Sequence, residues 1–283
     1  MTCRHTLEGR NVLVSGGATG IGRACAVRAV AEGAIVTICG RNAQRLESVA
    51  GEIAAANSGP GAIRWMAADV TRETDVERIV AHAAGTSGKL HGCIANAGGG
   101  GMPAPYHLQT AEEFQRVLGL NVMGTLLCIK HSISAMMTNG GGSFIAMSSI
   151  AAGTTHRYFG AYPAAKAAME AMMLNAADEY GHLNIRFNSI RPGYTATEIM
   201  ENVPPESLAY RSYVDNTPMG GVSRPEDIAD LARFLLSDES RRITGQVIAV
   251  DGGNEIRRGP DFSEAVTAIH GERAFGFGNR SNG

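Results

Sequence analysis

The chain has 283 residues, of which 44% are hydrophobic and 18% are charged, and this composition predicts a folded protein with a sizeable core. Lys and Arg number 25 against 27 Asp and Glu, so the net charge of -2 does not favour binding to nucleic acid, which needs a basic face. No apolar run reaches the roughly 18 residues of a membrane span, and the stretch MTCRHTLEGR lacks an apolar signal core. We therefore expect a cytoplasmic protein with neither a nucleic-acid nor a membrane partner.

Short β-rich runs alternate with longer helical ones along the chain. We expect strands at 11–15, 34–39, 63–68, 91–95, 142–148, 184–190 and 246–250, and helices near 20–32, 42–56, 72–84, 111–137, 161–180 and 225–236. Strands that alternate with helices predict right-handed crossovers and a parallel sheet that is covered on both faces. The predicted fold is a single-domain, doubly wound, Rossmann-like α/β protein of about seven strands.

Two segments fall outside this alternation. Residues 191–223 lack a clear hydrophobic period and contain four prolines, and a connection of this length predicts a functional lid over the substrate. We expect residues 1–253 to form the domain and residues 254–283 to form a C-terminal extension. Hydrophobic residues in the extension could dock on a neighbouring subunit, and they are Phe262, Val266, Ile269, Phe275 and Phe277.

The five cysteines, Cys3, Cys25, Cys39, Cys93 and Cys128, are odd in number and widely spaced. Buried, reduced thiols are the expected state, rather than a disulfide framework or a metal site.

A glycine-rich turn, SGGATGIG at 15–22, lies between the first predicted strand and the first predicted helix. Glycines permit a tight turn and a close approach of the backbone to a ligand, and the helix N-terminus offers free N–H groups to a pyrophosphate. Its spacing is G-x3-G-x-G rather than the usual G-x-G-x-x-G of dinucleotide folds. The candidate cofactor-binding residues of this turn are Gly16, Thr19, Gly20, Ile21 and Gly22.

The end of the second strand bears on the choice between NADP(H) and NAD(H). NAD-binding chains usually place a carboxylate there for the ribose hydroxyls, whereas this chain reads Cys39-Gly40-Arg41-Asn42. A guanidinium can pair with a 2′-phosphate, so Arg41 favours NADP(H), with NAD(H) still possible. Alternatively, Arg41 caps a surface turn.

The stretch GAYPAAK at 160–166 places Tyr162 and Lys166 four residues apart, on one face of a predicted helix. If that helix begins near Ala161, Pro163 lies in its first turn, where the missing N–H has no cost. We expect the ammonium of Lys166 to lower the pKa of the Tyr162 phenol, so that it can exchange a proton with an alcohol or carbonyl.

Several motifs occur together and in one order: SGGATGIG, ANAG (95–98), LNVMG (120–124), MSSIAAG (147–153), YPAAK and RPGYTAT (191–197). With SRPEDIA (223–229) and TGQVIAVDGG (244–253), they make the chain resemble the short-chain dehydrogenase/reductase family over roughly residues 7–253. The resemblance implies a catalytic set of Asn121, Ser149, Tyr162 and Lys166. In that set Ser149 holds the substrate oxygen, Lys166 binds the nicotinamide ribose, and Asn121 binds a water; a buried structural amide is the alternative role for Asn121.

The same resemblance implies further contacts to a nicotinamide cofactor. Asp69 and Val70 would contact the adenine, Asn96, Ala97 and Gly98 would flank the cofactor, and a segment after the sixth strand would hold the carboxamide and diphosphate; the residues of that segment are Pro192, Gly193, Thr195 and Thr197. Tyr162 and Lys166 would contact the cofactor as well. Ala95 replaces the first Asn of the usual Asn-Asn-Ala-Gly turn.

These features together predict an oxidoreductase that transfers a hydride between NADP(H) and a small secondary alcohol or ketone. A 3-oxoacyl thioester reductase and a non-catalytic NAD(P)-sensing protein remain as alternatives, although sensors on this fold typically lose the Tyr or the Lys. The resemblance also implies a homo-oligomer, either a tetramer or a dimer.

Overall fold

The computed structural model describes residues 6–198, 200, 203–257, 259–260, 262–271 and 274. Cys3, Phe275 and Phe277 lie outside the described residues. The cysteines within them, Cys25, Cys39, Cys93 and Cys128, are buried and free, as expected.

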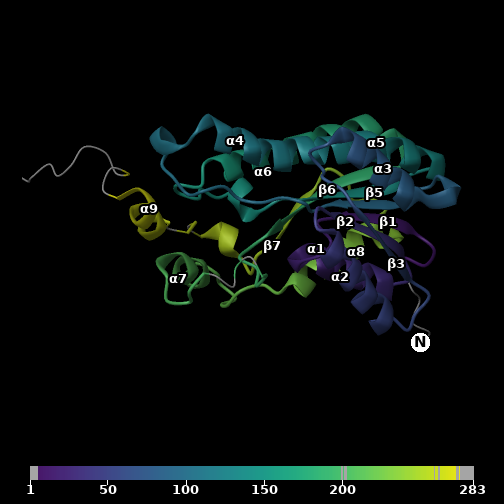
Figure 1. Cartoon of the computed structure of the whole chain (residues 1–283), viewed down its shortest axis with the longest axis horizontal. Helices are drawn as coiled ribbons and strands as arrows, with labels where there is room; N and C mark the ends of the chain where they lie inside the picture. Colours follow the sequence, from purple (N-terminus) through teal and green to yellow (C-terminus); the bar gives the residue numbers. More distant parts are fainter. Residues whose placement is uncertain are drawn as a thin grey trace, which may run out of the picture.

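A seven-stranded sheet forms the centre of the molecule (Figure 1). Its strands are β1 (Asn11–Ser15), β2 (Ile35–Gly40), β3 (Ala62–Ala67), β4 (Gly92–Ala95), β5 (Gly142–Met147), β6 (Ile185–Pro192) and β7 (Val247–Val250). The order across the sheet is β3-β2-β1-β4-β5-β6-β7, and each pair of neighbours runs parallel. The predicted doubly wound α/β fold is confirmed.

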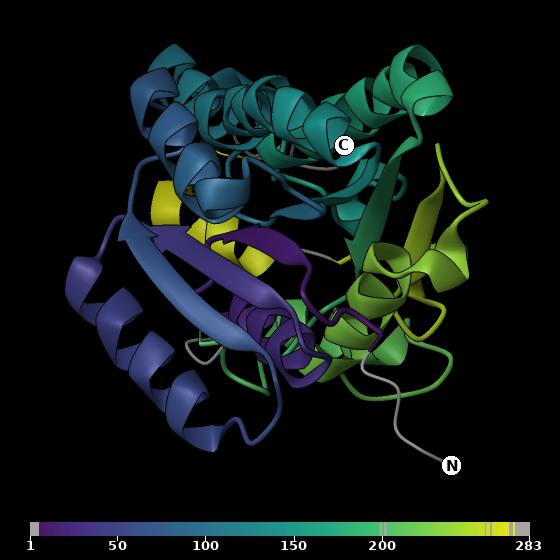
Figure 2. The same cartoon turned by 90° about the vertical axis from the view of Figure 1, so that its right-hand side faces the viewer.

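Helices cover both faces of this sheet, and Figure 2 shows the two layers separately. The helices are α1 (Gly20–Ala31), α2 (Ala43–Ala56), α3 (Glu73–Ala84), α4 (Ala111–Leu118), α5 (Gly124–Asn139), α6 (Ala161–Tyr180), α7 (Leu208–Asp215), α8 (Pro225–Leu236) and α9 (Ser263–His270). One apolar cluster joins α1, α2 and α8 to one face, and a second joins α3, α5 and α6 to the other. All five residues of β1 are buried, because both faces of a central parallel strand are covered.

The segment Ala111–Asn139 is helical throughout and has the length and mean hydropathy, 1.3, of a helix that could cross a membrane. Here it packs against α3, β4 and β5. Leu127, Cys128 and Met136 on it are buried in the core. Core helices meet the same test of length and composition, so this segment is a core helix of the fold.

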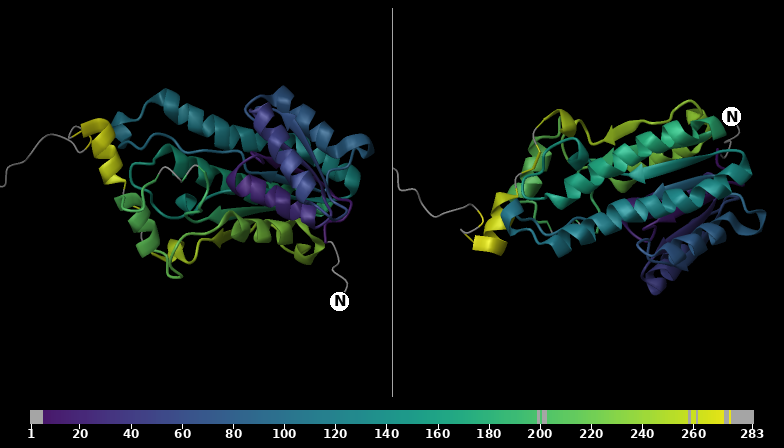
Figure 3. Two further views of the ribbon diagram at one scale, coloured as in Figure 1. Left: turned by 60° about the horizontal axis from the view of Figure 1, so that its bottom comes forward. Right: turned by 90° about the horizontal axis from the view of Figure 1, so that it is seen from above.

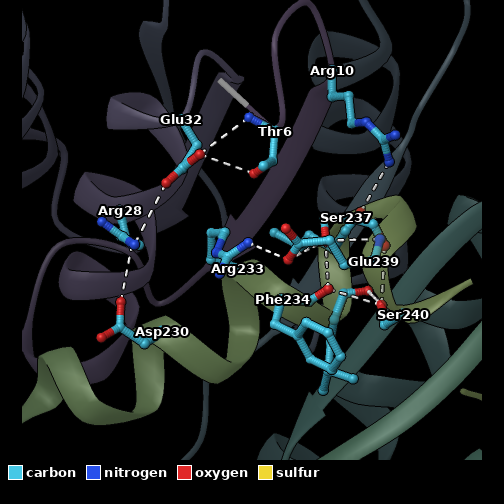
Figure 4. Close-up of polar contacts among 12 residues, drawn as sticks. Thr6, Arg10, Arg28, Glu32, Asp230, Arg233, Phe234, Ser237, Glu239 and Ser240 are labelled. Carbon is cyan, nitrogen blue, oxygen red and sulfur yellow. Dashed lines mark hydrogen bonds and ion pairs between the residues drawn. The ribbon is translucent and has the colours of Figure 1, made fainter. Parts of the chain in front are cut away.

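Hydrogen bonds and ion pairs link the start of the described chain, α1 and α8, at the end of the molecule opposite α9 (Figure 4). Glu32 accepts hydrogen bonds from the backbone N and the hydroxyl of Thr6, at 3.1 and 2.9 Å. Arg28 lies between Glu32, at 3.5 Å, and Asp230, at 3.0 Å. This network fastens the C-terminal end of α1 to α8.

Two helices lie where the sequence predicts no regular structure. Within the expected lid, α7 begins after Ser207, whose side chain accepts a hydrogen bond from the backbone N of Tyr210. In the C-terminal extension, α9 lies next to α7 beyond the sheet (Figure 3). Glu264 of α9 accepts a hydrogen bond from the backbone N of Leu208, at 3.1 Å. The described part of the extension therefore packs on its own chain.

Candidate active site

The candidate site lies at the carboxyl ends of the central strands. β1 ends at Ser15, β4 at Ala95, β5 at Met147 and β6 at Pro192, and loops from all four line one cavity of about 810 Å³. In open parallel sheets ligands bind at this edge, where the chain crosses from one face to the other.

The glycine turn after β1 is built for close backbone contact. Gly16 and Gly20 have positive φ angles of 64° and 48°, which residues with a Cβ atom rarely adopt. A Cβ on Gly22 would lie 2.2 Å from the carbonyl oxygen of Gly16, so only glycine fits there. The turn thus presents the N-terminus of α1 to the cavity without side chains in the way.

Asn96 and Ser15 hold this turn in place. The side-chain amide of Asn96 donates to the carbonyl oxygens of Ser15 and Gly16, at 3.0 and 3.2 Å. The hydroxyl of Ser15 accepts from the backbone N of Asn96 and of Ala97, at 3.0 and 2.9 Å. Asn96 was predicted as a cofactor-flanking residue; the supporting role of Ser15 was not predicted, although it is the first residue of the glycine motif.

A carboxylate lies against the N-terminus of α1. Glu198, an exposed residue of the lid segment, accepts a hydrogen bond from the backbone N of Gly20 at 2.9 Å. Free N–H groups and the helix dipole attract anions at this position, and the same features suit a pyrophosphate. The glycine turn therefore fits a dinucleotide cofactor. No signal in the sequence pointed to Glu198.

Asn121 is fully buried in a π-turn, Gly119–Met123, that separates α4 from α5. Its side-chain N donates to the carbonyl oxygens of Gly99 and Val117, both at 2.9 Å, and its Oδ1 lies 3.3 Å from the backbone N of Gly99. Asn121 is therefore a buried amide that bonds to the backbone, which is the alternative role considered for it. π-Turns within helices are frequent at functional sites.

Tyr162 and Ser149 meet inside the cavity. α6 begins at Ala161, so Pro163 lies in the first turn as expected. Both residues line the cavity, and Ser149 lies close enough to the Tyr162 hydroxyl to favour its ionised form. Desolvation of the phenol raises the pKa of Tyr162, and the nearby Ser149 side chain opposes this rise only in part. The expectation of a lowered pKa was therefore wrong for the structure as it stands, because the effect of burial exceeds the effect of neighbouring groups.

Lys166 lies below the tyrosine ring, with its Nζ 5.4 Å from the ring centroid. The Nζ donates a hydrogen bond to the carbonyl oxygen of Met147 at 2.7 Å. Burial lowers the pKa of Lys166 to about 7, while the negative charge of Glu170 opposes the shift. Because the pKa is close to neutrality, both forms of Lys166 exist at working pH, so its ammonium can release a proton and its neutral amine can take one up.

Glu170 connects this site to the end of the sheet, a role that sequence reasoning missed. Its carboxylate accepts from the hydroxyl of Ser148 at 2.6 Å and from two nitrogens of Arg191, at 2.7 and 2.6 Å. Arg191 also donates to Glu255 at 2.6 Å. In the sequence, the i, i+4 spacing of Lys166 and Glu170 indicates only that the two side chains share a helix face. It does not predict the partners of Glu170, which come from the ends of β5 and β6, or the contact of Arg191 with the C-terminal segment.

Most predicted site residues lie on the cavity wall. Those that line it are Gly16, Thr19, Gly20, Ile21, Asn96, Ala97, Gly98, Ser149, Tyr162, Lys166, Pro192, Gly193, Thr195 and Thr197. Five others lie outside the lining residues, namely Gly22, Arg41, Asp69, Val70 and Asn121. Of these, Arg41 is exposed directly after β2, and the carboxylate of Asp69 accepts from the N and hydroxyl of Thr71 at 2.9 and 2.7 Å.

Comparison with known proteins agrees with this geometry. A family model described as enoyl-(acyl carrier protein) reductase, one of the models of the short-chain dehydrogenases and reductases, matches residues 16–255. The chain belongs to the short-chain dehydrogenase/reductase family. The region matched runs from the glycine turn to just past β7, and so includes every element that lines the cavity except α9.

Similar members of the family are close in both sequence and structure. Cis-4-hydroxycyclohexanecarboxylate dehydrogenase of Sinomonas cyclohexanicum is 34% identical over 86% of this chain and 96% of its own length. The structure of a short-chain type dehydrogenase/reductase from Mycobacterium ulcerans is 42% identical over 95% of this chain and 98% of that one, with a TM-score of 0.91. 7α-Hydroxysteroid dehydrogenase, solved with NADH and 7-oxo glycochenodeoxycholic acid, is 30% identical over 88% of this chain and 96% of that one, with a TM-score of 0.82.

Proposed function

We propose that the protein is an oxidoreductase that transfers a hydride between NADP(H) and a cyclic secondary alcohol or ketone, with Tyr162 as the general acid/base. The observation that carries the proposal is that one cavity is lined by Tyr162, with Ser149 beside its hydroxyl, by Lys166 and by the glycine turn. The two hydroxyls at one end of the cavity suit the oxygen of a carbonyl substrate. The helix N-terminus at the other end suits the pyrophosphate of a dinucleotide.

The proposed mechanism gives each residue one task. Ser149 holds the substrate oxygen beside Tyr162, and Tyr162 donates its proton to that oxygen in reduction or accepts one in oxidation. The bound cofactor supplies or accepts the hydride. The raised pKa of Tyr162 keeps the phenol protonated at neutral pH, which suits its role as the acid in ketone reduction. Lys166, anchored on Met147, places a positive charge under the ring and is available to ribose hydroxyls.

The preference for NADP(H) is supported by Arg41, an exposed cation directly after β2, and by the lack of a carboxylate at residues 39–42. The cyclic substrate class is supported by the names of two relatives, which refer to a cyclohexane carboxylate and a steroid. The 7α-hydroxysteroid dehydrogenase was solved with NADH rather than NADPH, so the choice between the two cofactors is tested separately below.

The decisive test of the chemistry is Tyr162→Phe, which removes the exchangeable proton and keeps the ring. Turnover of a panel of cyclic ketones should fall to below a few per cent of the parent rate, while the Kd of NADPH, measured by fluorescence, stays within about twofold. Tyr180→Phe is the matched control, because Tyr180 lies at the far end of the same helix and does not line the cavity. Retention of more than a few per cent of the turnover by Tyr162→Phe would refute the assignment.

The cofactor choice has a separate test. Arg41→Ala should raise the Kd of NADPH by about 10- to 100-fold, the range expected for loss of a charge-assisted contact to phosphate, and should leave the Kd of NADH nearly unchanged. Arg45→Ala, one helical turn along α2, serves as the control for a general change in surface charge. Equal effects of Arg41→Ala on the two cofactors would contradict the preference for NADP(H).

We also propose a homo-oligomer whose contacts involve α5 and α6. Exposed apolar side chains lie on both helices, with Leu126, Met137 and Leu174 between 41% and 51% exposed. Size-exclusion chromatography with light scattering should give two or four times the chain mass, and Leu174→Glu should lower that mass. A monomeric parent protein would contradict the proposal.

A further inference from the structure

The cavity has an outer wall that lies beyond the region of family resemblance. Four residues of the C-terminal segment line it, namely Phe262, Glu264, Ala265 and Ala268. The same cavity holds Ser149 and Tyr162. In Figure 1, α9 lies near α7 at the end of the molecule, beyond the carboxyl ends of the strands.

An aromatic stack connects this wall to the reacting centre. The ring of Phe262 is stacked on that of Phe159, with centroids 5.2 Å apart and planes at 17°. Phe159 in turn meets the ring of Tyr162 at 5.4 Å and 59°. A Cβ on Gly100 would lie 2.6 Å from the ring of Phe159, so this glycine leaves the room that the ring occupies. Phe159 and Phe262 therefore present apolar surface directly beside the proton donor.

The segment is anchored to its own chain at several points. The carboxylate of Glu264 accepts from the backbone N of Leu208 at 3.1 Å, which joins α9 to α7. Val266 is fully buried. A Cβ on Gly259 would lie 1.9 Å from the carbonyl oxygen of Thr155, so the backbone before α9 lies directly on the loop that follows Ser149. The wall is thus a packed part of the pocket.

The charge of the lining is uneven. Among the described residues that line the cavity, the cation is Lys166 and the carboxylates are Glu198 and Glu264. The Nζ of Lys166 is directed to the carbonyl oxygen of Met147. A substrate carboxylate at the outer end of the pocket would lie near Glu264 with no cation from the lining beside it, and like charges repel.

We propose that Phe262–Ala268 is the specificity-determining wall of the substrate pocket. Phe262, held by Phe159, contacts the carbon ring of the substrate, and Glu264 disfavours substrates that carry a carboxylate. The preferred substrates are therefore neutral cyclic ketones and alcohols, in contrast to the acid named in the Sinomonas relative. This inference rests on the proposed oxidoreductase function and adds the substrate class.

The test compares kcat/KM of the full chain for cyclohexanone, 4-oxocyclohexanecarboxylate and 2-hexanone. The parent should prefer cyclohexanone to both others. Phe262→Ala should lower kcat/KM for cyclohexanone about tenfold and for 2-hexanone much less, since the lost contact is with a ring face. The control is Ile269→Ala on α9, the helix that begins directly after Phe262, because Ile269 is 42% exposed and does not line the cavity. It should leave all three values within twofold.

Glu264→Gln is the second variant, and it keeps an oxygen that can accept the hydrogen bond from Leu208. It should raise kcat/KM for 4-oxocyclohexanecarboxylate about threefold at low salt and leave cyclohexanone unchanged. A parent preference for the carboxylate, or equal effects of Phe262→Ala on cyclic and acyclic ketones, would overturn the inference while the oxidoreductase proposal stands.

If the parent turned over none of the three ketones, thermal shifts with each ketone would test the wall independently of turnover. Cyclohexanone should then raise the Tm of the parent more than that of Phe262→Ala. Equal shifts would overturn the inference.

Discussion

Gly98 offers a sharp test of how tightly the site is packed. An ideal Cβ on this residue would lie 2.7 Å from Oδ1 of Asn121 and 3.2 Å from Nζ of Lys166. Neither atom is free to move, because the amide of Asn121 is bonded to Gly99 and Val117 and the Nζ of Lys166 is bonded to Met147. Gly98→Ala must therefore displace one of them or strain the loop.

The magnitude follows from this geometry. Overpacking a fixed site costs about 1–3 kcal/mol, and a disrupted buried hydrogen bond adds about 1 kcal/mol. We therefore expect Gly98→Ala to lower the free energy of unfolding by about 2–4 kcal/mol and the Tm by roughly 4 °C or more. A shift of Lys166 by about 1 Å can lower turnover on the order of 100-fold.

Gly99→Ala is the matched control, since the nearest atom to its Cβ is Cδ2 of Leu120 at the ordinary contact distance of 3.7 Å. Both substitutions remove the same backbone freedom from the unfolded chain, so that effect cancels in the comparison. The assays are calorimetry for Tm and steady-state turnover of a cyclic ketone. Equal stability and equal turnover of the two variants would refute the packing argument.

Three further results are expected. Glu198→Gln should tighten NADPH binding about threefold at low salt, with the gain lost in about 1 M salt, because no carboxylate then competes for the N–H of Gly20; unchanged binding would contradict this. The kcat/KM for ketone reduction should decline as pH rises above about 7 and Lys166 loses its charge, and Glu170→Gln should move that decline to lower pH; an unmoved profile would argue against coupling of the two residues. Between pH 7 and about 10 the unfolded chain holds the Lys166 proton that the folded chain has released, so stability rises with pH. The Tm of the parent should therefore rise relative to that of Lys166→Met between pH 7 and 9.5, and a constant difference would refute the shift.

The strands and the main helices could be read from the sequence because their signals are local. β1 matched at both ends, and α6 begins at Ala161 as the position of Pro163 requires. The glycine turn and the Tyr162–Lys166 pair were equally readable, since the residues of each motif are close together in the sequence. Continuous apolar runs that alternate with helical ones specify a parallel sheet before any contact is known.

Only the tertiary structure decided which distant residues share an environment. Glu198 reaches Gly20 across 178 positions, and Arg191 meets Glu255 across 64, so no local pattern contains either contact. The pKa of Tyr162 depends on how far its hydroxyl is removed from water, which packing determines and a four-residue spacing does not. The position of the segment before α9 depends likewise on a distant residue, because Phe262 stacks on the ring of Phe159.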